Sequence, residues 1–203
     1  MTAATLGSAL VLASTGKRGI PSSARMRHDD REDVLACQRG EREAFERLVE
    51  RYQRDVYRLC YRYVNNHQDA DDMAQETFLR AYRAIRAFRG DSAFATWLYR
   101  IAVNTCLNFR ASRKPDPGLI ETASAGSPAV LDDLEREERF RLVRDAVQRL
   151  PDKQRATLIL KIYHELTHEE VAAIVGSSVG TVKANLFHAL GNLRKLLGLT
   201  GQK

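Results

Sequence analysis

The chain has 203 residues, of which 29% are charged, and its formal net charge is +6. This length allows one large or two small domains, and the basic balance favours a polyanionic partner such as nucleic acid. The three cysteines, Cys37, Cys60 and Cys106, lie far apart, which excludes a CxxC zinc motif and an even disulfide framework and favours a reducing, cytoplasmic location. No apolar run approaches the roughly 20 residues that span a bilayer, so we expect no membrane insertion.

Residues 1–27 contain four basic residues but no acidic and no aromatic residue. Because such a segment buries little apolar surface, we expect a disordered basic tail. Met26 is a candidate for the true start of the protein, a hypothesis that N-terminal sequencing of the native protein tests.

Residues 28–114 are expected to form the first helical domain. From about Asp33 to Lys114 apolar residues recur at helical spacing, Pro is absent, and Gly occurs only at positions 40 and 90. The pattern predicts four helices that pack on one another, with breaks near the two glycines.

The charge of this block reverses along the chain. Residues 65–79 hold four acids and no base, and Asp69, Asp72 and Glu76 fall on one helical face. Such a face can dock a basic protein surface, hold a metal for phosphodiester chemistry, or simply be solvated. A metal-dependent nuclease is therefore one hypothesis for the function.

Residues 80–114 hold eight bases against a single acid, interleaved with aromatic residues. Bases and rings together suit unpaired nucleotides, because rings stack on exposed bases while arginines hold phosphates. We expect Phe88 and Trp97 to lie in the core, and Phe94, in a loop over residues 89–96, to be exposed.

Residues 115–134 are rich in Pro and Gly and acidic, which predicts a linker. Residues 135–198 are expected to form a second helical domain. There, Thr167 with Glu170 forms a capping-box signal, Gly176 ends a short helix, and Ser177 or Ser178 can cap the next helix. Two short helices around such a turn predict a helix-turn-helix, whose second helix enters the major groove of DNA.

Residues 164–168 read HELTH, which matches the HExxH signature of zinc proteases and makes an enzyme the main rival hypothesis. That chemistry needs His164 and His168 one turn apart on a continuous helix and a third ligand further along. The capping signal at Thr167 predicts a helix boundary inside the motif, and no acid follows Glu170. We therefore expect no metal and no cofactor.

Five segments of the chain resemble one family. DADDMAQETFLRAYR at residues 69–83 and FRGDSAFATWLYRIAVN at residues 88–104 look like region 2 of the extracytoplasmic-function (ECF) sigma factors of bacterial RNA polymerase, in the sigma-70 superfamily. LPDKQR at residues 150–155, followed by LTHEEVA at 166–172 and VGTVK at 179–183, looks like region 4. The resemblance covers residues 33–197 and implies an all-α fold of two small helical domains joined by a flexible acidic linker.

The resemblance also implies roles for individual residues. Residues implied to bind the core polymerase are Asp69, Asp72, Gln75, Glu76 and Phe78. Residues implied to bind and melt −10 DNA are Phe94, Arg100, Asn104, Asn108, Arg110 and Arg113, and Phe94 would capture a flipped base. Residues implied to bind −35 DNA are Ser178, Thr181, Lys183, Ala184, Phe187, His188 and Lys195.

As a family member, the chain would direct core RNA polymerase to promoter DNA without enzymatic chemistry of its own, would be held inactive by an anti-sigma factor, and would carry its acidic linker where RNA later passes. It departs from the family pattern at residues 184–188, where ANLFH replaces a Ser-Arg and an arginine-rich stretch. A stand-alone helix-turn-helix regulator is the alternative, although it leaves the charge reversal of the first block unexplained.

Overall fold

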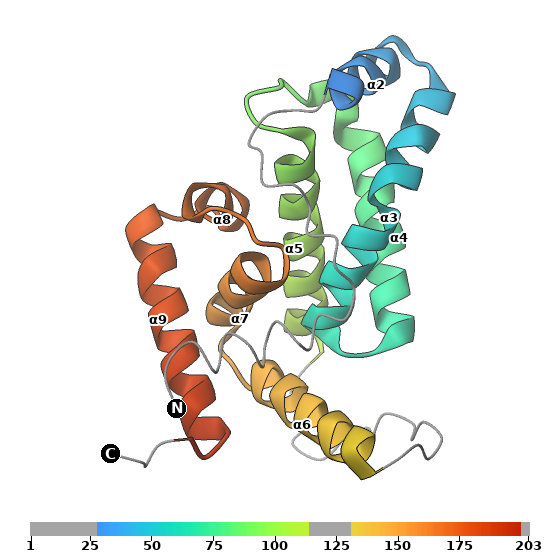
Figure 1. The fold of residues 1–203 in the computed structure, drawn as a ribbon. Coiled ribbons are helices and arrows are strands. Elements are labelled where there is room, and N and C mark those ends of the chain that lie inside the picture. The colour runs from blue at the N-terminus through green and yellow to red at the C-terminus, as the bar shows by residue number, and fades with distance from the viewer. Residues whose placement is uncertain (1–27, 114–130, 200–203) are drawn as a thin grey trace.

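A computed structural model describes residues 28–113 and 131–199 of the chain. The expected N-terminal tail with Met26 and most of the expected linker lie outside the described residues. The described part contains eight α-helices and no strand, which confirms the all-α fold class (Figure 1).

The first block consists of the four expected helices: α2 (His28–Arg39), α3 (Arg42–Val64), α4 (His67–Ala84) and α5 (Phe94–Ser112). The breaks fall at Gly40 and Gly90, both with positive φ, as expected. A third break, at Asn65, has no Gly or Pro to announce it. Asn65 adopts a left-handed conformation with φ of 55°, which asparagine tolerates better than most residues.

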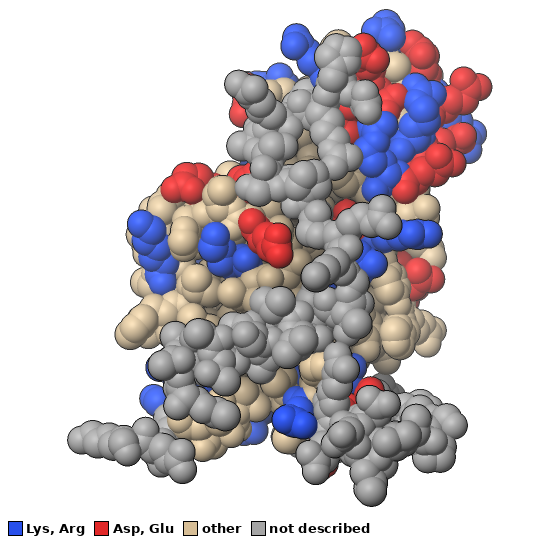
Figure 2. Space-filling model, in the orientation of Figure 1, with Lys and Arg blue, Asp and Glu red and all other residues tan. Residues whose placement is uncertain are grey.

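Ion pairs join α2 to α3. Asp30 and Asp33 of α2 are buried and pair with Arg51 at 2.5 and 2.9 Å, while Arg47 pairs with Asp33 at 2.7 Å. Figure 2 shows acidic and basic side chains side by side over this end of the molecule. The charges here thus pair with each other, and they fix α2 on the bundle.

The second block contains α6 (Leu131–Gln148), α7 (Asp152–Leu158), a π-helical segment (Ile159–Tyr163), α8 (His168–Val175) and α9 (Val179–Leu196). The buried Arg155 of α7 donates hydrogen bonds to carbonyl oxygens of Val147, Gln148 and Leu150. These carbonyls lie at the C-terminal end of α6, where no further helical turn can satisfy them. Arg155 of the LPDKQR segment therefore fixes the α6–α7 corner.

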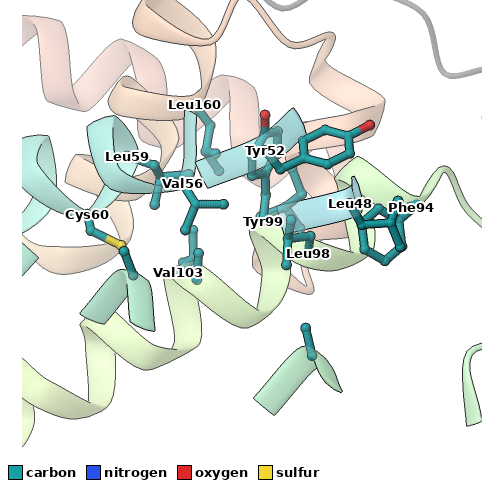
Figure 3. Packing of buried hydrophobic residues seen from close by; sticks show 14 of the residues in the cluster. Leu48, Tyr52, Val56, Leu59, Cys60, Phe94, Leu98, Tyr99, Val103 and Leu160 are labelled. Carbon is teal, nitrogen blue, oxygen red and sulfur yellow. The ribbon is translucent and has the colours of Figure 1, made fainter. Parts of the chain in front are cut away.

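The two blocks pack directly on each other. Leu160, Leu166, Val171 and Ile174 of the second block belong to the same buried cluster as the residues of α3 and α5. Figure 3 shows Leu160 among Tyr52 and Val56 of α3 and Tyr99 of α5. The described residues thus form one closed body, whereas the sequence indicated only two separate domains.

Polar contacts border this shared core. Arg110 of α5 pairs with Asp152 of α7 at 3.0 Å, and Gln148 donates to the carbonyl of Arg62 at 3.0 Å. The guanidinium of Arg62 lies 4.3 Å from the ring centre of Tyr163. These contacts are hydrophilic, so water can replace them if the blocks separate.

Candidate functional site

The helix-turn-helix is confirmed in its local details. Thr167 accepts a hydrogen bond from the backbone N–H of Glu170, whose carboxylate accepts one from the N–H of Thr167. Gly176 ends α8 with φ of 64°, and the side chain of Ser178 caps α9. Val182 and Leu193 are buried, which fixes the face that α9 turns to the core.

The opposite face of α9 carries the residues expected at −35 DNA. All of them are exposed: Ser178, Thr181, Lys183, Ala184, Phe187, His188 and Lys195. Ser178 and Thr181 are already hydrogen-bonded to each other through their hydroxyls at 2.9 Å. Because α9 contains no acidic residue, its exposed face is positively charged.

Arg100, Asn104 and Asn108 form an exposed polar stripe along α5. They are spaced by four residues, which places them on one face of the helix, and all three are exposed. The other two arginines expected at −10 DNA have protein partners. Arg113 makes a bidentate pair with Asp69 at 2.7 and 3.0 Å, and Arg110 pairs with Asp152.

The expectation that Phe94 is exposed is wrong. Phe94 is the first residue of α5, and its side chain is 1% exposed. Its ring packs against Tyr52 and Trp97, both at 5.6 Å between centroids, and against Phe88. The expected loop extended to residue 96, but α5 already begins at Phe94. Phe94 therefore lies one helical turn before the buried Leu98, on the same face, and its side chain enters the core. Phe88 is buried as expected, while Trp97 is half-buried at the edge of the core.

A groove of about 620 Å³ runs between α3 and α4. Its α4 wall is formed by Asp71, Ala74, Gln75 and Phe78, and its α3 wall by Val49, Gln53, Arg54, Tyr57 and Arg58. The groove therefore offers a carboxylate, an amide and an apolar wall on one side and two guanidinium groups on the other.

Only two of the five residues expected to bind core polymerase, Gln75 and Phe78, line this groove. Asp69 is buried in its pair with Arg113, while Asp72 and Glu76 are not among the residues that line the groove, and Glu76 pairs with Arg80 at 2.6 Å. The acidic residue that lines the groove is Asp71, which was not among the residues expected to bind core polymerase. The i, i+4, i+7 spacing of Asp71, Gln75 and Phe78 is the signal that would have found it.

The HExxH residues do not form a zinc site. His164 follows the π-helical segment, Glu165 has a φ of 53°, and His168 begins α8, so the expected helix boundary does divide the motif. His164 is buried against the ring of Tyr99 at 5.5 Å. Within the described ranges, no three His, Cys, Asp or Glu side chains gather as metal ligands, and Asp69, proposed above for a nuclease metal, is held by Arg113.

Family models match both blocks. Residues 48–115 match the one described as Sigma-70 region 2, and residues 140–193 match Sigma-70, region 4. The RNA polymerase sigma-H factor of Pseudomonas aeruginosa is 39% identical over 180 residues, which cover 83% of this chain and 93% of that protein. The chain belongs to the sigma-70 family. It is also 40% identical to the ECF RNA polymerase sigma-E factor of Escherichia coli K12, over 77% of this chain and 87% of that one.

Solved structures support the fold of this sigma factor. CnrH, solved with the cytosolic domain of CnrY, has a TM-score of 0.65 at 24% identity over 85% of this chain and 99% of its own. RpoE of Bartonella quintana, solved with the anti-sigma factor NepR, has a TM-score of 0.60 at 23% identity over 77% of this chain and 98% of its own. Among the helices described here, none is long and apolar enough to cross a membrane.

Proposed function

We propose that this sigma factor binds core RNA polymerase through the α3–α4 groove and reads two promoter elements with α5 and α9. The observation that carries the proposal is the pair of exposed polar helix faces, one in each family-matched block: Arg100, Asn104 and Asn108 on α5, and the acid-free face of α9. The protein works by binding alone, without catalysis, in the cytoplasm where its polymerase acts.

The groove suits a helical protein partner. Phe78 and Val49 supply apolar surface, while Asp71 and Gln75 on one wall and Arg54 and Arg58 on the other supply charge and hydrogen bonds. A buried apolar anchor surrounded by polar groups is the usual composition of a stable protein interface. Asp72, which is exposed and follows Asp71 in the chain, adds a second negative charge to α4 that can attract a basic partner.

The stripe on α5 suits the −10 element. Asparagine side chains can both donate to and accept from base edges, and the positively charged Arg100 can hold a phosphate. In the closed structure Arg110 and Arg113 face Asp152 and Asp69, so they reach DNA only after these pairs break. The expected role of Phe94 in capturing a flipped base requires its ring to leave the core that it occupies in the closed structure.

Promoter binding requires the two blocks to separate. Elements about 25 base pairs apart are roughly 85 Å apart along B-DNA, at about 3.4 Å per pair. In the closed structure α5 packs on α8 and α8 on α9, and packed helices are 8–10 Å apart, so α9 lies within about 20 Å of α5. The closed body therefore represents the state before promoter binding.

An anti-sigma factor is a proposed partner. The support comes from the two similar structures above, whose descriptions name complexes with CnrY and with the anti-sigma factor NepR. Such a partner would act on this chain by holding the closed state or by covering the groove.

The experiment measures, by fluorescence anisotropy, how tightly the full-length protein binds sigma-free core polymerase. We expect Asp71→Lys to weaken binding at least about tenfold, because it places a like charge opposite the basic partner. Asp145→Lys is the matched control, since Asp145 is an exposed acid on α6 outside the groove. No binding by the wild type, or equal binding by both variants, would contradict the proposal.

A further inference from the structure

Phe187 is the most exposed of the large apolar side chains in the described residues. Its side chain is 75% exposed, against 55% for Leu142, the next in order. Its ring contacts that of the neighbouring His188, at 5.7 Å between centroids. Burying this ring against a partner would therefore be favourable.

The surroundings of Phe187 fit DNA. One and two turns before it on the same face lie Ala184 and Gly180, both small and exposed, so the ring projects beyond its neighbours. Lys183 and Arg194 flank the ring on this face, and α9 carries no acid. Cations around an apolar centre, on the second helix of a helix-turn-helix, complement phosphates on either side of a major groove.

Arginine, asparagine and glutamine, which read purines with two hydrogen bonds, are absent from this face near Phe187 in the described helix, where Lys183 is the nearest base-reading cation. Asn185 lies on the opposite side of α9 from Phe187, and Asn192 donates to Gln154 at 2.9 Å. Arg194 stands in the last turn of the helix, far from the end that enters the groove. Apolar contact by Phe187 therefore adds to the base discrimination that the polar residues of this face provide.

We propose that Phe187 reads thymine, by packing its ring on the C5-methyl group that only thymine presents in the major groove. Phenylalanine is one of the side chains suited to this contact, and the methyl group distinguishes an A·T pair from a G·C pair. The inference rests on the proposed function, and it names the base that α9 selects in the −35 element.

The test uses holoenzyme assembled from the full chain and sigma-free core polymerase. Promoter DNA is first selected with the wild-type holoenzyme from a pool randomised at the −35 element. Each thymine of the selected element is then replaced singly by deoxyuridine, which differs only in lacking the methyl group. We expect one thymine at which this change weakens binding about fourfold, the value of burying one methyl group.

Variants then assign the methyl contact to Phe187. The Phe187→Ala holoenzyme should bind the thymine and deoxyuridine probes equally. In a second pair of probes, cytosine or 5-methylcytosine replaces that thymine, and the added methyl group should strengthen binding by the wild type only. Leu142→Ala removes another exposed apolar side chain and should keep the fourfold preference. Thermal unfolding should be unchanged in both variants because neither side chain is buried.

The outcomes separate the two proposals. Failure of the wild-type holoenzyme to select any DNA overturns the proposed function and this inference together. This inference alone is overturned if every thymine of the selected element can be replaced by deoxyuridine without loss of binding. It is also overturned if the Phe187→Ala holoenzyme keeps the preference for the methyl group. In those cases the ring serves a protein partner instead.

Discussion

His164 is a neutral imidazole enclosed between the two helical blocks. It is buried, its ring lies against Tyr99 of α5, and the guanidinium groups of Arg62 and Arg58 are nearby. Burial, reinforced by these two positive charges, lowers the pKa of His164 to about 3. A protonated His164 is therefore incompatible with the closed structure.

This gives the stability a defined pH dependence. In the unfolded chain the pKa of His164 is near 6.5, so the unfolded state takes up a proton at a higher pH than the folded state does. The free energy of unfolding is therefore unaffected by His164 protonation above about pH 6.5. It decreases as the pH falls from there toward 3, because only the unfolded chain takes up the proton. By pH 5 the free energy of unfolding should have dropped by about 2 kcal/mol.

Urea denaturation between pH 5 and 8 measures this effect. His164→Gln carries no titrating group, so the difference in unfolding free energy between it and the wild type isolates the histidine from the carboxylates. If the unfolding free energies of the two proteins changed in parallel with pH, protonation of His164 would not be linked to unfolding.

Some residues could be placed from sequence and some could not. The capping pair Thr167 and Glu170 was predictable because its hydrogen bonds are local to three residues. The burial of Phe94 depends on where α5 starts and on the tertiary partner Tyr52, and the sequence pattern contains neither. Glu165 adopts a left-handed conformation usually left to glycine, asparagine or aspartate, so no local rule predicts it.

At the level of elements, the N-terminus of α9 is capped by Ser178 and not by its neighbour Ser177. The side chain of Ser178 accepts a hydrogen bond from the N–H of Thr181 at 3.1 Å, whereas Ser177 only donates to a carbonyl at 3.3 Å. The sequence left the choice between the two open. The structure decides it, because Ser178 has the extended backbone conformation of an N-cap.

Ser178→Ala should lower the free energy of unfolding by about 1 kcal/mol, the usual value of an N-cap side chain. Ser177→Ala is the matched control and should change it by less than about 0.5 kcal/mol. Thermal or urea unfolding of the two variants measures both values. Equal losses in the two proteins would mean that the cap does not stabilise α9.

Helices were predicted well where their signals were local and poorly where they were not. Gly40 and Gly176 each mark a helix end that the structure confirms, and Gly90 lies in the loop between α4 and α5. The π-helical segment Ile159–Tyr163 has no such marker, and it forms where Ile159 and Leu160 enter the core shared with the first block. Its geometry follows from tertiary packing, which the helical pattern alone does not contain.

On the scale of the whole molecule, the principal feature is the closure of the two blocks over a shared core. The sequence predicted two domains from the break in composition at residues 115–134, but it held no signal for their contact. The contact combines buried apolar residues such as Leu160 with polar pairs such as Arg110–Asp152. In the proposed function, promoter binding exchanges these contacts for those with polymerase and DNA.

Energy transfer between two labels can follow this opening. Glu43 of α3 and Glu169 of α8 are exposed, so Glu43→Cys and Glu169→Cys supply one label in each block. The native cysteines are buried, and burial raises the pKa of Cys37 to about 11, so they should remain unlabelled. We expect transfer to fall when core polymerase and promoter DNA are added. Unchanged transfer would mean that the blocks act without separating.

Reconstituted transcription shows whether this chain is the promoter-reading subunit of RNA polymerase. Sigma-free core polymerase is mixed with the purified protein and with promoter DNA selected by the holoenzyme, and the RNA products are mapped. We expect transcripts from a defined start site that depend on both the protein and an intact −35 element. Transcription that is independent of the protein, or none from any selected DNA, would contradict this role.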